Sequence, residues 1–129
     1  IPVGEFRKIT DGLSKTLMLS EQVQGQGTDL RGFSWWGWAA GFETSLTPNS
    51  GQPDVMQQAG YCDRTVVTNP PCTGQSSALP MHAGARSRHI GGVHAVNCDG
   101  SARFFDNDIF FDVWQALGTT QGEETAGLE

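Results

Sequence analysis

The sequence feature that most constrains the fold is the pair Asp99-Gly100, which lies between two alternating runs, GGVHAVNC and SARFFD. An Asp-Gly pair between such runs is the strongest short-range signal for a β-hairpin. A two-residue turn at this pair would place Asn97 opposite Ala102. We expect the nearly apolar face of the hairpin to meet the core. That face would carry Val93, Ala95, Asn97, Ala102 and Phe104.

The segment after the hairpin predicts a short amphipathic helix over residues 109–117. Its apolar residues recur at helical spacing and form one stripe. Asp108 fits the N-cap position, and Gly118 fits a C-terminal stop. We expect this helix to pack on the apolar face of the hairpin. The stripe consists of Phe110, Val113, Trp114 and Leu117.

The segments before the hairpin give weaker signals. Residues 16–21 favour a strand, with a helix as the alternative. Aromatic residues between positions 33 and 46 favour a strand pair bent at Gly37 and Gly41. Residues 47–80 are rich in Pro, Asn, Ser and Gly, which is typical of a long loop. With 17 glycines in 129 residues, the pattern predicts one α+β domain over residues 1–129. We expect an antiparallel sheet and one short helix.

Two of the three cysteines, Cys62 and Cys72, lie in the polar, proline-rich stretch GYCDRTVVTNPPC. Two free thiols in a solvent-side loop are unusual, so we interpret the pair as a disulfide, with unpaired thiols as the alternative. A disulfide would imply an oxidising compartment. We expect the third cysteine, Cys98, to be a small, half-buried residue of the hairpin.

The charge distribution argues against nucleic acid as a partner. The formal net charge is −6, and the excess of acids lies entirely after Cys98, where seven acids accompany the single base Arg103. Phosphate binding requires a basic face, which this chain lacks. The acidic end could still meet a cation or a basic protein surface.

No pattern in the sequence predicts catalysis. The chain has no G-x-S-x-G element, and no cysteine has an evident partner base. Arg86-Ser87-Arg88-His89 could clamp an anion, but we favour the interpretation that these donors pair with loop carbonyls or with hairpin acids such as Asp99. We therefore expect a protein that is not an enzyme.

The candidate metal ligands also lack a known spacing. His82, His89 and His94 match no common zinc signature, so we predict no metal site and no cofactor. The acids at 106, 108 and 112, with Asn107, could offer oxygens to calcium. This stretch lacks the glycine and the terminal glutamate of an EF-hand loop, and acids also suit the start of a helix.

Alternation places Trp36 and Trp38 on one face of the expected strand. Side by side and exposed, they could form a platform for sugar rings. Burial in the core is the favoured alternative. A binding module for extracellular glycan or calcium is therefore the second function that the sequence suggests.

Three segments of the chain resemble one protein family. The segment ARSRHIGGVHAVNCDGSARFF is similar to the H-X9-DG signature, because His89 precedes Asp99-Gly100 by nine intervening residues. ITDGLSKTLMLSE and WQALGT resemble two further elements of the same family, known as DUF1559. This signature is typical of large planctomycete-type protein families that are related to type IV pilins and to type II secretion pseudopilins. Three positions depart from the family's usual residues. Ile90 stands in place of proline, and Lys15 and His94 each stand in place of asparagine.

The resemblance implies an envelope-anchored protein of which this chain is the head. An N-terminal apolar helix, outside this chain, would anchor it in the membrane, and its partners would be other pilin-like subunits or envelope proteins. The resemblance brings no catalytic residues. We therefore expect the motif to be structural, with Arg88, His89 and Asp99 pinning the loop before the hairpin to its turn. The structural motif comprises Arg88, His89, Gly91, Gly92, Asp99 and Gly100.

Overall fold

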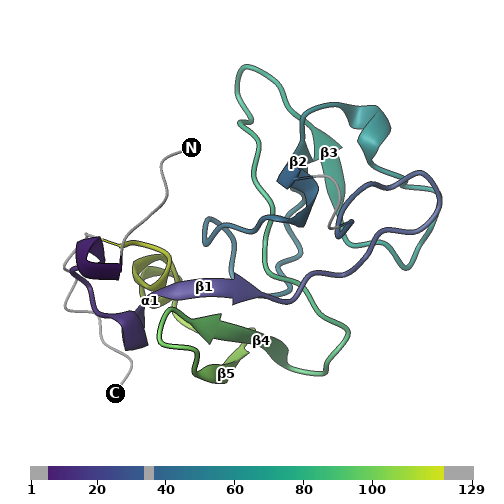
Figure 1. Ribbon diagram of the computed structural model, residues 1–129. Helices are drawn as coiled ribbons and strands as arrows, with labels where there is room; N and C mark the ends of the chain where they lie inside the picture. The colour runs from purple at the N-terminus through teal and green to yellow at the C-terminus, as the bar shows by residue number, and fades with distance from the viewer. Residues whose placement is uncertain (1–5, 34–36, 121–129) are drawn as a thin grey trace.

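The computed structural model describes residues 6–33 and 37–120, and Figure 1 shows two sheets at opposite ends of the molecule. One sheet is antiparallel, in the order β1 (Leu17–Ser20), β4 (Gly92–Asn97) and β5 (Ala102–Asp106). The other is a parallel pair, β2 (Asp54–Met56) and β3 (Cys72–Gly74). Helix α1 (Phe111–Leu117) accompanies the larger sheet. The α+β class, with an antiparallel sheet and a short C-terminal helix, is confirmed.

Four short 3-10 helices complete the described structure: Phe6–Lys8, Leu13–Lys15, Gly37–Ala40 and Ala59–Tyr61. The strand predicted for residues 16–21 is present as β1. Part of the strand pair predicted between residues 33 and 46 falls on residues 34–36, which lie outside the described residues. Over residues 37–46 the prediction is wrong, because the chain forms a 3-10 helix at Gly37–Ala40 and irregular turns beyond it. Within the described ranges, no helix has the length and apolar character needed to cross a membrane.

The hairpin forms at the predicted place, but its register differs by one residue. Val93 lies opposite Phe105, and Asn97 closes the turn on Ser101 with an N–H···O distance of 2.9 Å. The loop therefore has three residues and ends at Gly100, whose φ of +85° suits a loop that closes through a left-handed glycine. The predicted two-residue turn is wrong.

The change of register turns β5 over, because neighbouring side chains point to opposite faces of a strand. The predicted inner residues of β4, Val93 and Ala95, are buried as expected. On β5, however, Phe105 is 3% exposed, whereas the predicted core residue Phe104 is 47% exposed. The apolar face of the hairpin is thus completed by Phe105.

Helix α1 packs on this face through Trp114. The Phe105 and Trp114 rings meet edge to face at 5.4 Å between centroids, and the Trp114 indole N–H donates to the Leu46 carbonyl at 2.8 Å. Gly118 ends the helix as predicted. Two details of the helix prediction are wrong: Phe110 occupies the N-cap position in place of Asp108, and its side chain is exposed. The main core consists of Leu17, Ala85, Val93, Ala95, Phe105, Trp114 and Leu117.

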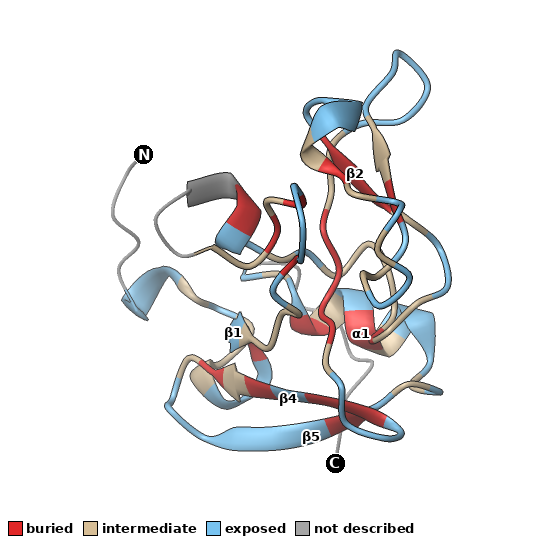
Figure 2. Ribbon diagram, turned by 90° about the vertical axis from the view of Figure 1, so that its right-hand side faces the viewer, coloured by how far each residue is buried: buried red, intermediate tan, exposed pale blue. Residues whose placement is uncertain are grey.

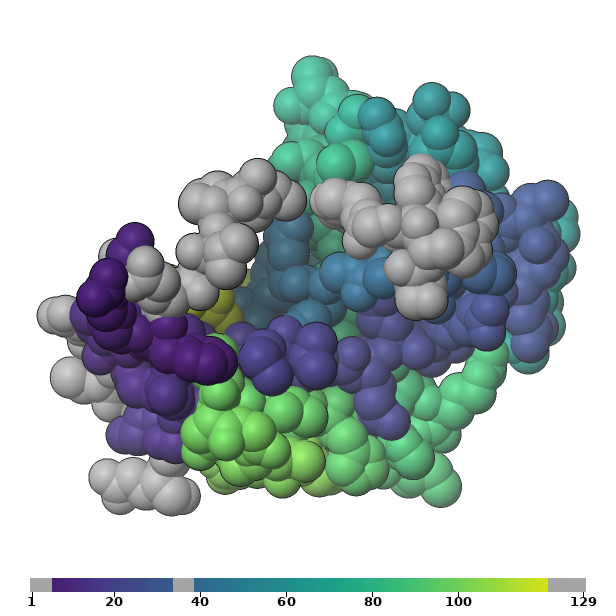
Figure 3. Space-filling model, in the orientation of Figure 1, coloured from purple at the N-terminus to yellow at the C-terminus, as the bar shows by residue number. Residues whose placement is uncertain are grey.

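Residues 47–80, which we call the excursion, carry the smaller sheet and most of a second core. Figure 2 shows burial on β2 at one end of the molecule and on β4 at the other. The excursion is largely irregular, as predicted, but the short parallel pair β2–β3 was not predicted. Cys62 and Cys72 form the predicted disulfide. The second core consists of Ala39, Met56, Cys62 and Cys72, with Tyr61 against it. In Figure 3 the light green hairpin lies at the bottom, along β1, and the teal part of the excursion lies at the top.

The observed register makes a prediction that separates neighbouring phenylalanines. Phe105→Ala should lower the free energy of unfolding by about 3–5 kcal/mol, because it empties the core beside Trp114. Phe104→Ala should cost only about 1 kcal/mol, because that ring is half exposed. Urea denaturation of both variants measures the difference.

Phe105→Leu keeps most of the apolar volume and should cost less than about 1.5 kcal/mol. It provides a folded reference if the alanine variant is too unstable to measure. A larger loss for Phe104→Ala than for Phe105→Ala would instead support the two-residue turn.

Candidate functional site

Four buried charged residues join the two ends of the molecule, and we call them the ion network. Asp29, Arg31, Asp54 and Arg86 are each at most 4% exposed. Two positive and two negative charges alternate through them, so the group is formally neutral. Isolated buried charges are very costly, whereas a complete set of partners offsets that cost.

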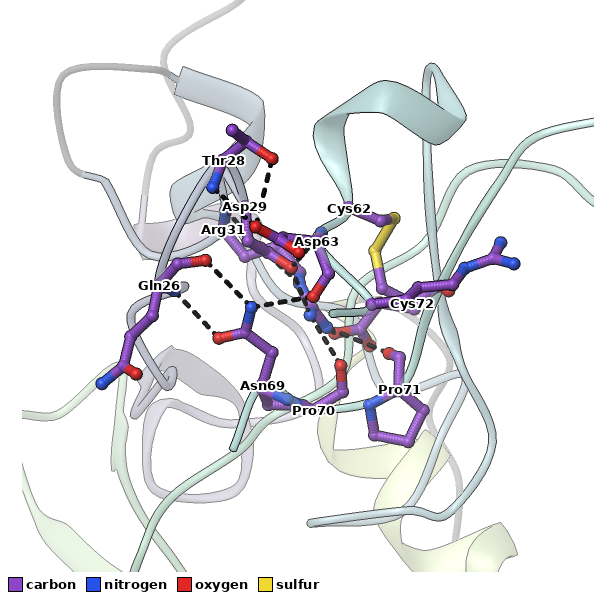
Figure 4. A network of polar contacts seen from close by, with 12 residues as sticks. Gln26, Thr28, Asp29, Arg31, Cys62, Asp63, Asn69, Pro70, Pro71 and Cys72 are labelled. Atoms are coloured by element: carbon purple, nitrogen blue, oxygen red, sulfur yellow. Dashed lines mark hydrogen bonds and ion pairs between the residues drawn. A yellow bond between two sulfur atoms is a disulfide. The ribbon is translucent and has the colours of Figure 1, made fainter. Parts of the chain in front are cut away.

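Arg31 lies at the centre of the ion network (Figure 4). Its Nε and Nη2 donate to the two carboxylate oxygens of Asp29, at 2.9 and 2.7 Å. Its Nη1 donates to Asp54 at 2.8 Å, and the Pro70 and Pro71 carbonyls accept the remaining hydrogen bonds. All five guanidinium N–H groups are thereby used. Burial alone would lower the pKa of Arg31, but the bonds to Asp29 and Asp54 outweigh it, and the pKa is raised.

Asp54 connects Arg31 to the segment that precedes the hairpin. Its Oδ2 accepts from Arg31 and from Arg86 Nε, at 2.8 and 2.9 Å. Its Oδ1 accepts from the Gly84 backbone and from Arg86 Nη2, at 2.8 and 2.9 Å. Arg86 also donates to the Ser50 and Gln52 carbonyls. The excursion is therefore held to residues 84–86 by charge-assisted bonds.

A second polar contact fixes the tip of the excursion against residues 26–28 (Figure 4). Asp63 accepts from the backbone and hydroxyl of Thr65, at 3.0 and 2.6 Å, and from the backbone of Thr28 at 3.0 Å. The hydrogen bond from the Thr65 hydroxyl contributes most to lowering the pKa of Asp63 to about 2, followed by the two backbone bonds. Asn69 exchanges hydrogen bonds with the backbone of Gln26.

A separate group, Glu21, His89 and His94, lies on the larger sheet, and we call it the histidine cluster. Glu21 Oε1 lies 3.0 Å from His89 Nε2, and Glu21 Oε2 lies 3.4 Å from His94 Nδ1. The His94 backbone N–H donates to Glu21 Oε2 at 2.7 Å. Partial burial acts to raise the pKa of Glu21, but the His94 backbone and the His89 ring outweigh it, and the pKa is lowered.

The motif residues Arg88, His89, Gly91 and Gly92 lie in the turn before β4 or at the start of that strand, whereas Asp99 and Gly100 lie in the hairpin turn. The motif residues therefore do not pair as predicted. His89 contacts Glu21, whereas Asp99 accepts from the Ser101 backbone and hydroxyl inside its own turn. Arg88 is exposed. The predicted pinning of His89 to Asp99 is therefore replaced by a contact between His89 and Glu21, the residue that follows β1.

The two glycines of the motif serve the backbone. Gly91 has a φ of +90°, which lets the chain reverse into β4. At Gly92 an added Cβ would lie 2.1 Å from the Phe105 carbonyl oxygen, so the close strand pairing requires glycine. Both positions support the hairpin that the motif contains.

The remaining candidate residues are dispersed. Trp36 lies outside the described residues, as does the side chain of Trp38, so the sugar platform stays a prediction. In the acidic stretch, Asp106 accepts from the Asp108 backbone and Asn107 accepts from Asn49. His82 lies just after the excursion, where its Nδ1 is 3.1 Å from the Pro80 carbonyl oxygen.

Sequence reasoning missed most of the ion network. Of its members only Arg86 was singled out, and its predicted pairing with loop carbonyls is found at Ser50 and Gln52. The other partners are far apart in the chain and follow no periodic pattern. The sequence offers only one weak indication of them: they are charged residues in short, turn-rich segments. The hydrophobic pattern of such segments does not predict where they lie in the fold.

The comparisons identify a family and no close relative. A family model described as "protein of unknown function (DUF1559)" matches residues 2–110. No curated protein and no solved structure matches the chain.

The ion network predicts a large cost for removing Asp54. Asp54→Asn should lower the free energy of unfolding by about 3–5 kcal/mol, because two buried guanidiniums lose a shared counter-ion. Asp112→Asn, at an exposed helix position, should change it by about 0.5 kcal/mol or less. Equal, small effects in urea denaturation would show that the network is not buried as described.

Asp63 predicts a loss of stability in acid. Its pKa is about 2 in the folded protein against 3.8 for an unperturbed aspartate. The contribution is therefore complete above pH 3.8 and is lost as the pH falls through about 2. Asp63→Asn should flatten the pH dependence of the melting temperature in this window, whereas Asp112→Asn should leave its slope unchanged. An unaltered slope in Asp63→Asn would contradict the described bonding.

Proposed function

Since the chain belongs to the DUF1559 family, whose function is not defined, we propose that it is the head domain of a pilin- or pseudopilin-like, envelope-anchored protein. Its role is structural and interactive, and it is not an enzyme. The observation that carries this proposal is that two of the three segments that resemble the family, residues 9–21 and 85–105, bond to each other.

That mutual bonding involves both backbone and side chains. The Cys98 N–H donates to the Thr16 carbonyl at 2.8 Å, and the Asp99 N–H donates to the Leu13 carbonyl at 3.0 Å. At the other end of β1, Glu21 holds His89. Residues 13–21 and 89–99 are thereby joined at both ends. Such an arrangement favours a motif that maintains the scaffold.

The disulfide supports a location outside the cytoplasm. Disulfides persist in periplasmic and extracellular proteins and are rare in reducing compartments. The Cys62–Cys72 bond closes the excursion, whose polar loops have little apolar core of their own. An oxidising compartment would therefore contribute directly to the stability of this part of the head.

The edges of the larger sheet offer surfaces for other subunits. In the order β1-β4-β5, both β1 and β5 are edge strands. Met18 and Leu19 on β1 are 45% and 58% exposed, and Phe104 on β5 is also exposed. Exposed edges with apolar side chains favour pairing with another chain. Further pilin-like subunits or envelope proteins would suit these edges.

The free thiol favours a role without covalent catalysis. Burial, followed by the nearby Asp99 charge, raises the pKa of Cys98. The reactive form of cysteine is the thiolate, so this thiol is less reactive than an exposed one. Cys98 thus fits a half-buried residue of the turn.

The proposal predicts where the natural full-length protein resides. Expressed with its upstream sequence, it should sediment with membranes, carry an oxidised Cys62–Cys72 pair, and be digested by protease added to spheroplasts. Residues 1–129 alone, exported behind a cleavable signal, provide the matched control and should remain soluble in the envelope fraction. A full-length protein found in the cytosol with reduced thiols would contradict the proposal.

A further inference from the structure

We propose that Glu21, His89 and His94 form a binding site for one divalent transition-metal ion of the zinc class. Two imidazole nitrogens and one carboxylate are the ligands that zinc and its neighbours accept, whereas calcium and magnesium prefer oxygen alone. The site does not depend on the pilin-like role.

The three side chains lie close to the separations that a shared metal ion requires. Ligand atoms bound at about 2.0–2.2 Å in a tetrahedral site lie roughly 3.3–3.6 Å from one another. Glu21 Oε1 lies 3.0 Å from His89 Nε2, and Glu21 Oε2 lies 3.4 Å from His94 Nδ1. One ligand atom from each of the three residues lies within 4.8 Å of the other two. In the part of the chain that is described, this is the one group of three such residues. Small shifts of the three side chains would bring their ligand atoms to these separations.

The fold holds each ligand in place before a metal binds. The Glu21 N–H donates to the His94 carbonyl at 3.1 Å and continues the β1–β4 pairing, so the two side chains lie across from each other. The backbone N–H of His94 donates to Glu21 Oε2 and so orients the carboxylate. Such supporting hydrogen bonds are typical of metal sites.

His89 is brought to the pair by the turn that precedes β4. The Ser87 hydroxyl accepts from the His89 N–H at 3.1 Å and donates to the Gly92 carbonyl at 2.6 Å. The His89 and His94 rings then meet edge to face at 4.8 Å. The site therefore joins Glu21, which follows β1, His94 of β4, and His89 in the turn that precedes β4.

The surroundings leave room for further ligands. Both histidine side chains are about half exposed, at 52% and 53%. Glu21 and His89 also line a groove of about 500 Å³ that runs along residues 22–26 and 86–88. Three protein ligands and an open position characterise metal sites that take water or an exchangeable ligand. A molecule in the groove would lie beside the metal.

His94→Asn is a mild substitution at this site. The His94 side chain is about half exposed, and its backbone rather than its ring holds the strand pairing. The change therefore removes one ligand and should leave the hairpin intact.

Calorimetric titration of tag-free, chelator-treated protein with zinc chloride tests the site. We expect one zinc ion per chain and a rise in melting temperature, since a ligand of the folded state stabilises it. Cobalt chloride should give the visible absorption of a four- or five-coordinate ion. His94→Asn, His89→Asn and Glu21→Gln should each weaken zinc binding at least about tenfold, which is the smallest loss typical of disturbed metal sites.

His82→Asn and Cys98→Ser provide the matched controls, because they remove the remaining histidine and the free thiol. Both should bind zinc within about twofold of the parent protein. The proposal is overturned if no binding occurs at about 1 mM zinc, the weak end of measurable affinity. It is equally overturned if His94→Asn, folded by circular dichroism, binds zinc as tightly as the parent.

Discussion

The fold depends on four buried charged residues, which are stable in the interior only when each has all of its partners. Asp29, Arg31, Asp54 and Arg86 alternate in sign, and each carboxylate oxygen accepts at least two hydrogen bonds. Removing charge from water is costly, and only a full set of partners offsets the cost. The four residues come from three separate segments of the chain. Their pairing therefore positions those segments relative to one another.

This requirement explains how a chain with so much irregular structure keeps a defined shape. The apolar residues form two small cores, one around Trp114 and one around the disulfide. Hydrophobic contacts are non-directional and would permit several arrangements of these two parts. The bidentate pairing of Arg31 with Asp29, and of Arg86 with Asp54, has a strict geometry. The ion network thus fixes the arrangement of the two parts, whereas apolar burial provides most of the stabilisation.

The sequence predicted what local patterns determine. The Asp99-Gly100 hairpin, the helix around Trp114 and the Cys62–Cys72 bond follow from turn chemistry, helical spacing and cysteine context, and all three are present. The register was wrong by one residue because an Asp-Gly pair serves both two- and three-residue loops. Because of this shift by one position, the core contains Phe105 and not the predicted Phe104. The ion network and the histidine cluster could not be predicted, because their members meet only after β1 pairs with β4 and the excursion folds back.

Native-state hydrogen exchange of the unmodified chain tests the central role of the ion network most directly. The Val55 amide, bonded to His82 at 2.8 Å, reports on the excursion, and the Cys98 amide, bonded to Thr16 at 2.8 Å, reports on the larger sheet. If the network joins the two parts into one cooperative unit, both amides should exchange with the same opening free energy and the same dependence on denaturant. A Val55 amide that opens at least about 2 kcal/mol more easily, with a smaller dependence on denaturant than the Cys98 amide, would show that the excursion unfolds alone and would contradict the account.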